Sequence, residues 1–422
     1  MPAPPSARDI LALAQIVELV RAETAVTRPG LESVTGLGRT VVNDRIQDGL
    51  DLGVLTEMEA APSPQRRGRP SRTIRFRTEA GVILSAALGA VSLEAAVSDL
   101  DGTALVRSAR DIDIEDGPVT VLAVVQELFD ELLSRNPAAP VWGITIALPG
   151  PVDVASGSVV AAPAMPGWDD HDVRVPFRRR YDAPVWVENE VNAMAIGEWE
   201  RGEPQERRDL LFVKVASGIG SALVTNGRLH RGDSGAAGDI GHVRVTDDPS
   251  AVCRCGKVGC LAAVASGWAV LRKLSDHARS GASPLLAQRL AERGHIMPAD
   301  IGYAANAGDE LVHDAVADAA RLTGRTIAGV VNFANPGTLV LGGGAVRYGS
   351  VFFDEFRAAV LAGTIELAAR NLTIRPASLK FHEGTIGGAL LAAHRLFRTE
   401  SLRVWLADGS PIGSAQRLQS VA

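Results

Sequence analysis

The residues best suited to chemistry in this chain are its cysteines, because all three lie in one short segment, CRCGKVGC. They are Cys253, Cys255 and Cys260, and His242 lies eleven residues before the first of them. Three thiolates and one imidazole form the closed tetrahedral ligand set typical of a structural zinc ion. Unrelated buried cysteines or a redox pair are the alternatives, but the clustering of every cysteine in the chain favours a zinc site with these four ligands.

A second set of candidate residues lies near the N-terminus, on a predicted DNA-binding domain. Apolar residues recur at helical spacing over residues 8–23, and a shorter helix is expected over 28–35. A third helix runs from about 39 to 50, and a hairpin follows Gly53. This order of elements predicts a winged helix-turn-helix whose third helix enters the major groove of DNA.

The third helix has one apolar and one polar face. Val42, Ile46 and Leu50 lie on the apolar face and should pack inward. The candidate base-contacting residues on the polar face are Arg39, Thr40, Asn43 and Gln47. Residues 60–77 hold six Arg and no acidic residue, which favours a DNA contact over the alternative of a solvated linker. For the domain itself, the alternative is a small helical interaction domain. The candidate DNA contacts in this segment are Arg66, Arg67 and Arg69.

Length and charge distribution support a DNA-binding domain joined to a separate body. A chain of 422 residues is expected to form two or three domains. Its net charge is −6, yet residues 1–77 contain 11 Arg and 9 acidic residues. No secretory pattern is visible at the start, and the most apolar stretch, 81–97, contains Ser85, Ser92 and Glu94. The sequence therefore predicts a cytoplasmic protein without a membrane span.

From about residue 80 the pattern changes to strands separated by Gly-rich turns and helices. Segments 82–105 and 211–229 are each typical of a hairpin around a Gly-rich turn, followed by a second tight turn. Two such copies predict a duplicated α/β body with a cleft between its halves. A further helix is expected over 385–397, opening at Gly387 and Gly388, and no element is assigned beyond Thr399.

Several segments of this body resemble the ROK family, which comprises sugar kinases and related repressors. The matching segments are ALPGPVD (147–153), PAMPGW (163–168), VENEVNAMAIGE (187–198), SGIGSALVTNGRLHRGDSGAAGDIGH (217–242), CRCGKVGC (253–260) and NPGTLVLGGG (335–344). The resemblance covers roughly residues 77–398, and RRGRP (66–70) is similar to a basic segment of the family's repressors. It implies an actin-like, sugar-kinase-like bilobal body, and the winged helix-turn-helix is what distinguishes the repressors from free-standing kinases.

The resemblance also implies a division of the chain into domains. The winged helix-turn-helix is expected over residues 1–77 and a small α/β lobe over 78–190. A larger lobe, with the zinc knuckle and the surfaces for effector and dimer contacts, is expected over 191–384. The C-terminal helix 385–398 is expected to pack back onto the small lobe.

The sequence departs from the family's kinases at positions used for catalysis. Ala87 and Val91 replace the Asp and the Thr of the phosphate site, and Glu190 replaces the catalytic Asp. A lost carboxylate, a lost hydroxyl and a base displaced by about 1 Å all oppose phosphoryl transfer. These departures imply a regulator that is not an enzyme; an active sugar kinase with an added DNA-binding domain is the alternative.

The predicted effector site lies in this degenerate cleft. Ala164 and Ala262 replace an Asn and a Glu that contact sugar in the family. The residues expected to contact the effector are Gly167, Asn189, Glu190, Asp239 and His242. We therefore expect a repressor that binds operator DNA as a homodimer or dimer of dimers and responds to a sugar or another metabolite. A constitutive DNA-binding protein with an empty cleft is the second alternative.

Overall fold

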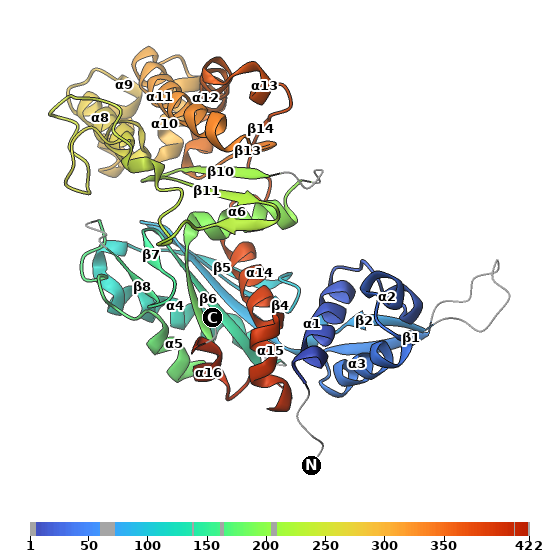
Figure 1. Ribbon diagram of the computed structural model, residues 1–422. Coiled ribbons are helices and arrows are strands. Elements are labelled where there is room, and N and C mark those ends of the chain that lie inside the picture. The colour runs from blue at the N-terminus through green and yellow to red at the C-terminus, as the bar shows by residue number, and fades with distance from the viewer. Residues whose placement is uncertain are drawn as a thin grey trace.

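The computed structural model describes residues 6–59, 72–136, 139–160, 164–203, 209–408 and 410–420. An N-terminal domain lies beside a body of two lobes, each built on a five-stranded sheet (Figure 1). Within the described ranges, no helix is long and apolar enough to span a membrane. The arrangement confirms the expected α/β fold, with a duplicated bilobal body and an N-terminal winged helix-turn-helix.

The N-terminal domain consists of three helices and a two-stranded wing. Its elements are α1 (Ala7–Arg21), α2 (Arg28–Thr35), α3 (Arg39–Asp51), β1 (Leu55–Glu59) and β2 (Arg72–Phe76). The hydroxyl of Thr27 caps α2, and Gly36 ends that helix with a φ of 68°, which allows the tight turn into α3. Val42 and Ile46 are buried and Leu50 is half-buried. The polar face of α3 is therefore turned away from the domain core.

The first lobe contains a sheet with the strand order β5-β4-β3-β6-β9. Its strands are β3 (Val82–Leu88), β4 (Ser92–Asp99), β5 (Ala104–Asp111), β6 (Val141–Leu148) and β9 (Val185–Asn189). The first three strands are antiparallel, and β6 and β9 add parallel strands. Helices α4 (Gly117–Ser134) and α5 (Arg174–Tyr181) contribute to the apolar core on one face, and α14 (Glu383–Phe397) packs on the other. A short antiparallel hairpin, β7 (Val152–Asp153) and β8 (Ser158–Val159), also belongs to this lobe.

The second lobe repeats this arrangement, with the order β12-β11-β10-β13-β14. Its strands are β10 (Leu210–Val215), β11 (Ile219–Thr225), β12 (Arg228–His230), β13 (Thr338–Gly342) and β14 (Thr373–Pro376). One face is covered by α7 (Leu261–Ala265), α8 (Gly267–Arg279), α9 (Pro284–Arg293), α10 (Pro298–Asn306), α11 (Glu310–Ala334), α12 (Ser350–Gly363) and α13 (Glu366–Ala369). The shared strand order supports the duplication inferred from the two Gly-rich hairpins.

Two helices, α6 (Glu190–Arg201) and α14, cross in close contact between the lobes (Figure 1). A Cβ atom at Gly387 would lie 1.7 Å from the carbonyl oxygen of Ala193, and one at Gly197 would lie 2.4 Å from that of Glu383. These glycines are required because the two backbones touch. The helix expected over 385–397 is present as α14, which begins two residues earlier. Gly387 lies inside this helix, where it serves the crossing and does not open the helix.

The chain continues past Thr399 into two helices for which the sequence indicated no structure, α15 (Thr399–Trp405) and α16 (Ala415–Ser420). Trp405 is fully buried, 5.7 Å from the ring of Trp142 in the first lobe. Phe397, at the end of α14, lies 5.2 Å from Phe76 of the wing in an edge-to-face contact. One apolar core thus joins the DNA-binding domain, the first lobe and the C-terminal helices.

Candidate effector cleft and metal centre

A cavity of about 640 Å³ lies between the two lobes. Asn189, Glu190, Asp239 and His242 all line it, together with the turn between β10 and β11. Gly167 does not line it, although its φ of 77° requires glycine in a loop beside Pro118. Four of the five predicted effector residues therefore share one cavity, whose size suits a small metabolite.

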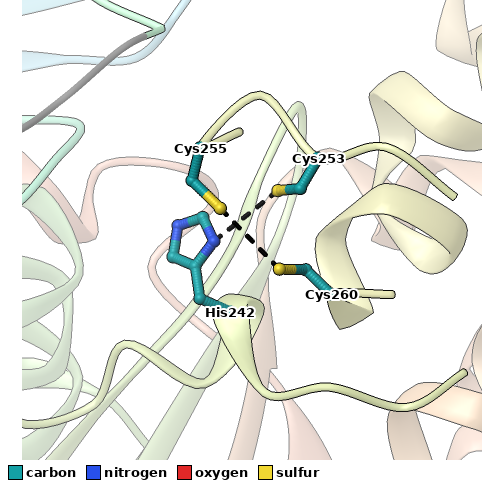
Figure 2. A group of neighbouring side chains, drawn as sticks. All are labelled: His242, Cys253, Cys255 and Cys260. Atoms are coloured by element: carbon teal, nitrogen blue, oxygen red, sulfur yellow. Dashed lines mark hydrogen bonds between the residues drawn. The ribbon is translucent and has the colours of Figure 1, made fainter. Parts of the chain in front are cut away.

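The four predicted metal ligands converge on one point at the wall of this cavity (Figure 2). Their candidate ligand atoms all lie within 4.8 Å of one another. Cys253 Sγ is 3.6 Å from His242 Nδ1, and Cys255 Sγ is 3.7 Å from Cys260 Sγ. Tetrahedral zinc with Zn–S bonds of about 2.3 Å separates its sulfur ligands by about 3.8 Å. The group could therefore hold a metal ion of this size.

The loop that carries the cysteines is shaped by its own backbone. The N–H of Gly256 donates to the carbonyl of Cys253 at 2.9 Å, and Gly259 has a φ of 84°. A Cβ atom at Gly259 would lie 2.0 Å from the carbonyl oxygen of Thr246. Burial, followed by the neighbouring thiols, raises the pKa of Cys260 to about 12. Thiols crowded in this way ionise together only beside a cation, which fits a metal centre.

The first residue of α6 is held by a lysine that the sequence analysis did not single out. Glu190 forms an ion pair with Nζ of Lys214 on β10, and the two side chains are 12% and 13% exposed. The other oxygen of Glu190 faces the turn between β3 and β4, since a Cβ atom at Gly89 would lie 4.0 Å from it. The ammonium competes for the lone pairs with which a general base accepts a proton. Glu190 is therefore a charge partner across the cleft.

Ala87 and Val91, the two positions predicted to depart from the kinase phosphate site, lie near the end of β3 and in the turn that follows it. Ala87 is paired in register with Glu94 of β4. Glu94 accepts a hydrogen bond from Thr385 Oγ1 at 2.7 Å and contacts His382 Nδ1 at 2.5 Å. Val91 is 64% exposed, and neither it nor Ala87 lines the cavity. The carboxylate beside position 87 is thus bound to the start of α14 and does not replace a metal-binding Asp.

Asn189 and Asp239 differ in how many of their side-chain hydrogen-bonding atoms are available to a ligand. Asn189 caps α6, because its Oδ1 accepts the N–H groups of Val191 and Asn192 at 2.8 and 3.2 Å. Its Nδ2 donates to the carbonyl of Gly150 at 2.8 Å. The side chain of Asp239 is 45% exposed, with Oδ1 3.8 Å from His242 Nε2. Asp239 is the better acceptor for a ligand hydroxyl, whereas Asn189 mainly fixes the helix start.

The predicted DNA-contacting residues of α3 divide into two pairs. Arg39 and Thr40 are exposed at the N-terminal end of the helix. Asn43 is half-buried and accepts a hydrogen bond from Arg28 Nε at 2.9 Å, while the amide of Gln47 donates within its own helix. Arg39 and Thr40 are therefore available to DNA, and Asn43 also fixes α2 against α3. The remaining candidates lie outside the described residues: Arg66, Arg67 and Arg69.

The sequence analysis did not identify two cationic residues of the second lobe that form ion pairs with the segment ENEVN (188–192). Lys214 pairs with Glu190, and Arg231 pairs with Glu188. A usable signal existed for the first, because Lys214 is one of four lysines in the chain and interrupts the apolar strand LLFVKV. Arg231 has no such signal, since arginine is common throughout this sequence.

A buried carboxyl group, that of Glu383, lies at the start of α14. Glu383 is 1% exposed, and its Oε2 has no hydrogen-bond partner among the described residues. Burial, followed by the nearby carboxylates of Glu198 and Glu94, raises the pKa of Glu383 to about 7. The native state therefore prefers the protonated form of this side chain.

Replacing Glu383 by Gln is expected to remove a pH dependence of stability. Between the ordinary glutamate pKa and the raised value of about 7, the native state binds a proton that the unfolded chain has released. The free energy of unfolding therefore falls as pH rises through this window, by at most roughly 3–4 kcal/mol, at about 1.4 kcal/mol per pKa unit. Glu383→Gln should be more stable than the parent at pH 8, measured by urea denaturation. Glu366→Gln, at a side chain 91% exposed, is the control; parallel pH profiles for parent and Glu383→Gln would contradict the expectation.

Comparison with known proteins relates both the body and the whole chain to one family. The model of the ROK family matches residues 83–395. A xylose repressor from Caldicellulosiruptor bescii is 26% identical over 366 residues, covering 86% of this chain and 90% of the repressor. A glucokinase from Thermotoga maritima is 30% identical over 295 residues, covering 68% of this chain and 91% of the glucokinase. The repressor match thus extends over more of the chain than the kinase match does.

Solved structures show the same difference in coverage. A ROK family transcriptional regulator, described as a homolog of the E. coli MLC protein, superposes with a TM-score of 0.75 at 23% identity, covering 99% of this chain and all of that one. A ROK family glucokinase from Streptomyces griseus, in complex with glucose and AMPPNP, has a TM-score of 0.66 at 26% identity and covers 74% of this chain. The match to the regulator includes the N-terminal domain, because it covers 99% of this chain. The match to the glucokinase covers only 74% of this chain.

Proposed function

The chain belongs to the ROK family, and we propose that within it this protein is a transcriptional repressor controlled by a small molecule. The observation that carries the proposal is the exposed N-terminal end of α3 on a winged domain whose core is continuous with a bilobal, cleft-bearing body. Such a helix end is the part of a helix-turn-helix that contacts base edges. We place the protein in the cytoplasm with the chromosome, acting as a dimer on an operator of two half-sites.

The cleft is proposed to bind the effector, and the Cys₃His group to hold zinc. His242 and Cys253 line the cavity and also belong to the metal group. A bound zinc would tie the loop after β12 to the cysteine knuckle and give this wall of the cavity a fixed shape. An effector that prefers one arrangement of the lobes would then shift the repressor between DNA-binding and non-binding forms.

The name of one relative suggests which effectors to test first. The relative from C. bescii is a xylose repressor, and we propose a sugar or sugar-derived metabolite as the effector here. Asp239 supplies an exposed carboxylate for hydroxyl groups. Ala164 and Ala262 line the cavity as methyl groups, so the pattern of hydroxyl recognition is proposed to differ from that of the family's kinases.

A sugar kinase is the second candidate function, favoured by the match to the T. maritima glucokinase. The ion pair between Glu190 and Lys214 counts against it, because it engages the only residue left at the position of the catalytic base. Ala87 and Val91 also leave the phosphate-site turn without its Asp and Thr. We therefore propose that the kinase fold is retained as a sensor.

Replacing Arg39 and Thr40 by Ala is expected to weaken binding to the operator more than binding to random DNA. Both side chains are exposed at the helix end, and a lost base contact costs about 1–3 kcal/mol of discrimination. The operator is first selected from a genomic fragment library. The affinity of each variant for this operator and for random DNA is then measured by fluorescence anisotropy. Arg107→Ala, an exposed arginine on β5 of the body, is the control. Equal loss on operator and random DNA would assign these residues to the phosphate backbone instead.

A second pair of variants separates the basic segment from the helix. Arg67→Ala with Arg69→Ala is expected to weaken binding to all DNA and to flatten its salt dependence, since each lost phosphate contact lowers the slope of log K against log salt by about 1. Asn43→Ala is expected to lose discrimination as well, with an added loss of stability because Asn43 bonds Arg28. Thermal unfolding of Asn43→Ala distinguishes the two effects.

A further inference from the structure

Arg231 of the second lobe pairs with Glu188 of the first lobe and so connects the two lobes. It follows β12 of the second lobe, and its guanidinium donates to Glu188 Oε2 of the first lobe, from Nη2 at 2.6 Å and from Nε at 3.2 Å. The other oxygen of Glu188 accepts from Asn192 Nδ2 at 2.9 Å. The Glu188 side chain is 1% exposed, so this is a buried carboxylate whose hydrogen-bonding capacity is filled.

The segment that follows Arg231, residues 232–238, is fixed at both ends, and its second half, residues 235–238, lines the cavity. At its start, the carbonyl of Arg231 accepts the N–H of Ala237 at 3.1 Å. At its end, the carbonyl of Gly238 accepts from the N–H and the hydroxyl of Ser221 on β11, at 2.8 and 3.0 Å. We call residues 232–238 the effector loop. One anchor is thus in the first lobe, through Arg231, and the other is in the second.

The effector loop also touches the first lobe directly and leads into the metal group. A Cβ atom at Gly235 would lie 3.2 Å from the carbonyl oxygen of Val152 in β7. Residues 235–238 line the cavity, and the chain continues through Asp239 to His242. A ligand in the cavity therefore contacts a segment whose position depends on the distance between the lobes.

We propose that Arg231 is the positioning residue that couples effector binding to the arrangement of the lobes. This inference rests on the proposed function and goes beyond it, because it assigns the coupling to one ion pair. An effector that displaces the effector loop changes the geometry of the bond between Arg231 and Glu188. The Glu188 carboxylate of that bond is buried, whereas the Arg231 side chain is 32% exposed. The two lobes therefore shift with the loop, or the guanidinium exchanges this partner for water.

The neighbourhood of Glu188 indicates that a variant at Arg231 still folds. Arg395 of α14 lies 3.8 Å from Glu188, and burial lowers its pKa to about 10, which leaves it charged at neutral pH. Glu188 thus keeps one cationic partner when Arg231 is replaced. Arg395 belongs to the same lobe as Glu188, through its helix on the first sheet, so it cannot substitute for Arg231 in joining the lobes.

The test compares Arg231→Met with the parent and with Arg228→Met, an exposed arginine on β12 that serves as the charge-matched control. Operator binding is measured by anisotropy, alone and with D-xylose or D-glucose as the probe. Arg231→Met is expected to bind the operator as the parent does, whereas release by the sugar requires roughly 5–150-fold more of it, the usual range of an allosteric coupling. Arg231→Lys should retain part of the response. An Arg231→Met variant that responds like the parent overturns the proposal.

A partner variant and a measurement without ligand make the test independent of the sugar chosen. Glu188→Gln should reproduce the effect, and adding Arg231→Met to it should cause no further loss, because both remove the same bond. Hydrogen exchange of the full chain should increase in residues 232–238 in Arg231→Met and stay unchanged in Arg228→Met. Unchanged exchange in Arg231→Met overturns the proposal even if no probe sugar acts. A parent protein that binds no operator refutes the proposed function instead, and leaves the exchange result to decide the role of Arg231.

Discussion

Cys255→Ser is expected to abolish metal binding and to destabilise the second lobe. The purified parent should contain one zinc per chain, because the four ligand atoms lie within 4.8 Å of one another in a set without an open position. Serine cannot supply the thiolate, and the remaining crowded thiols lose the cation that permits their ionisation. Each kcal/mol lost lowers the melting temperature by about 2–4 °C in a domain of roughly 200 residues.

The measurements are metal analysis by mass spectrometry and thermal unfolding with and without a chelator. Val252→Ser is the matched control, since Val252 lies in the same knuckle, is 50% exposed and contributes no ligand atom. The chelator should lower the melting temperature of the parent toward that of Cys255→Ser and have little effect on the variant. A metal-free parent, or a Cys255→Ser protein as stable as the parent, would falsify the zinc assignment.

The second large effect is expected in catalysis: sugar-dependent ADP release should stay at background. Ordinary kinases turn over at roughly 1–100 per second by holding magnesium and phosphates in line with the nucleophile. Ala87 provides no carboxylate for that purpose, and Glu94 beside it is engaged by His382 and Thr385. Glucose, mannose, N-acetylglucosamine and xylose should all be inactive in a coupled assay.

Restoring the missing phosphate-site residues tests why the protein is expected to lack kinase activity. Ala87→Asp with Val91→Thr should remain inactive, because Lys214 still engages Glu190. Adding Lys214→Thr frees the carboxylate and is the variant in which a trace of activity is expected first. A kinase of the same family assayed in parallel shows that the assay is working. Turnover by the unmodified protein in the ordinary kinase range would replace the sensor interpretation with a bifunctional one.

The spacing of apolar residues and glycines was sufficient to predict the helices and hairpins that form between residues close together in the chain. The winged domain follows from helical periodicity and Gly36, and α3 was predicted to within a residue. The two hairpins around Gly-rich turns predicted the repeated sheets, whose strand orders agree. In the helices and the two hairpins, hydrogen bonds between residues near in the chain select the structure, so the local pattern carries the information.

The C-terminal part of the chain shows where local patterns failed. Gly387 looked like a helix start, but its role is to let α14 touch α6. Helices α15 and α16 were missed because they are short and are stabilised by packing on distant residues, such as Trp142 against Trp405. Isolated helices of this length are not stable, so the tertiary core decides whether they form.

The sequence by itself was sufficient to predict the metal group and the departures from the kinase phosphate site. All three cysteines fall in one knuckle, and the residue types at positions 87 and 91 are visible without a fold. Only the tertiary structure decided the charge pairs between the lobes. Lys214 pairs with Glu190, and Arg231 pairs with Glu188, which is 43 positions away in the chain. A long cationic side chain can pair with any carboxylate within its reach, and that choice depends on how the two sheets are placed against each other.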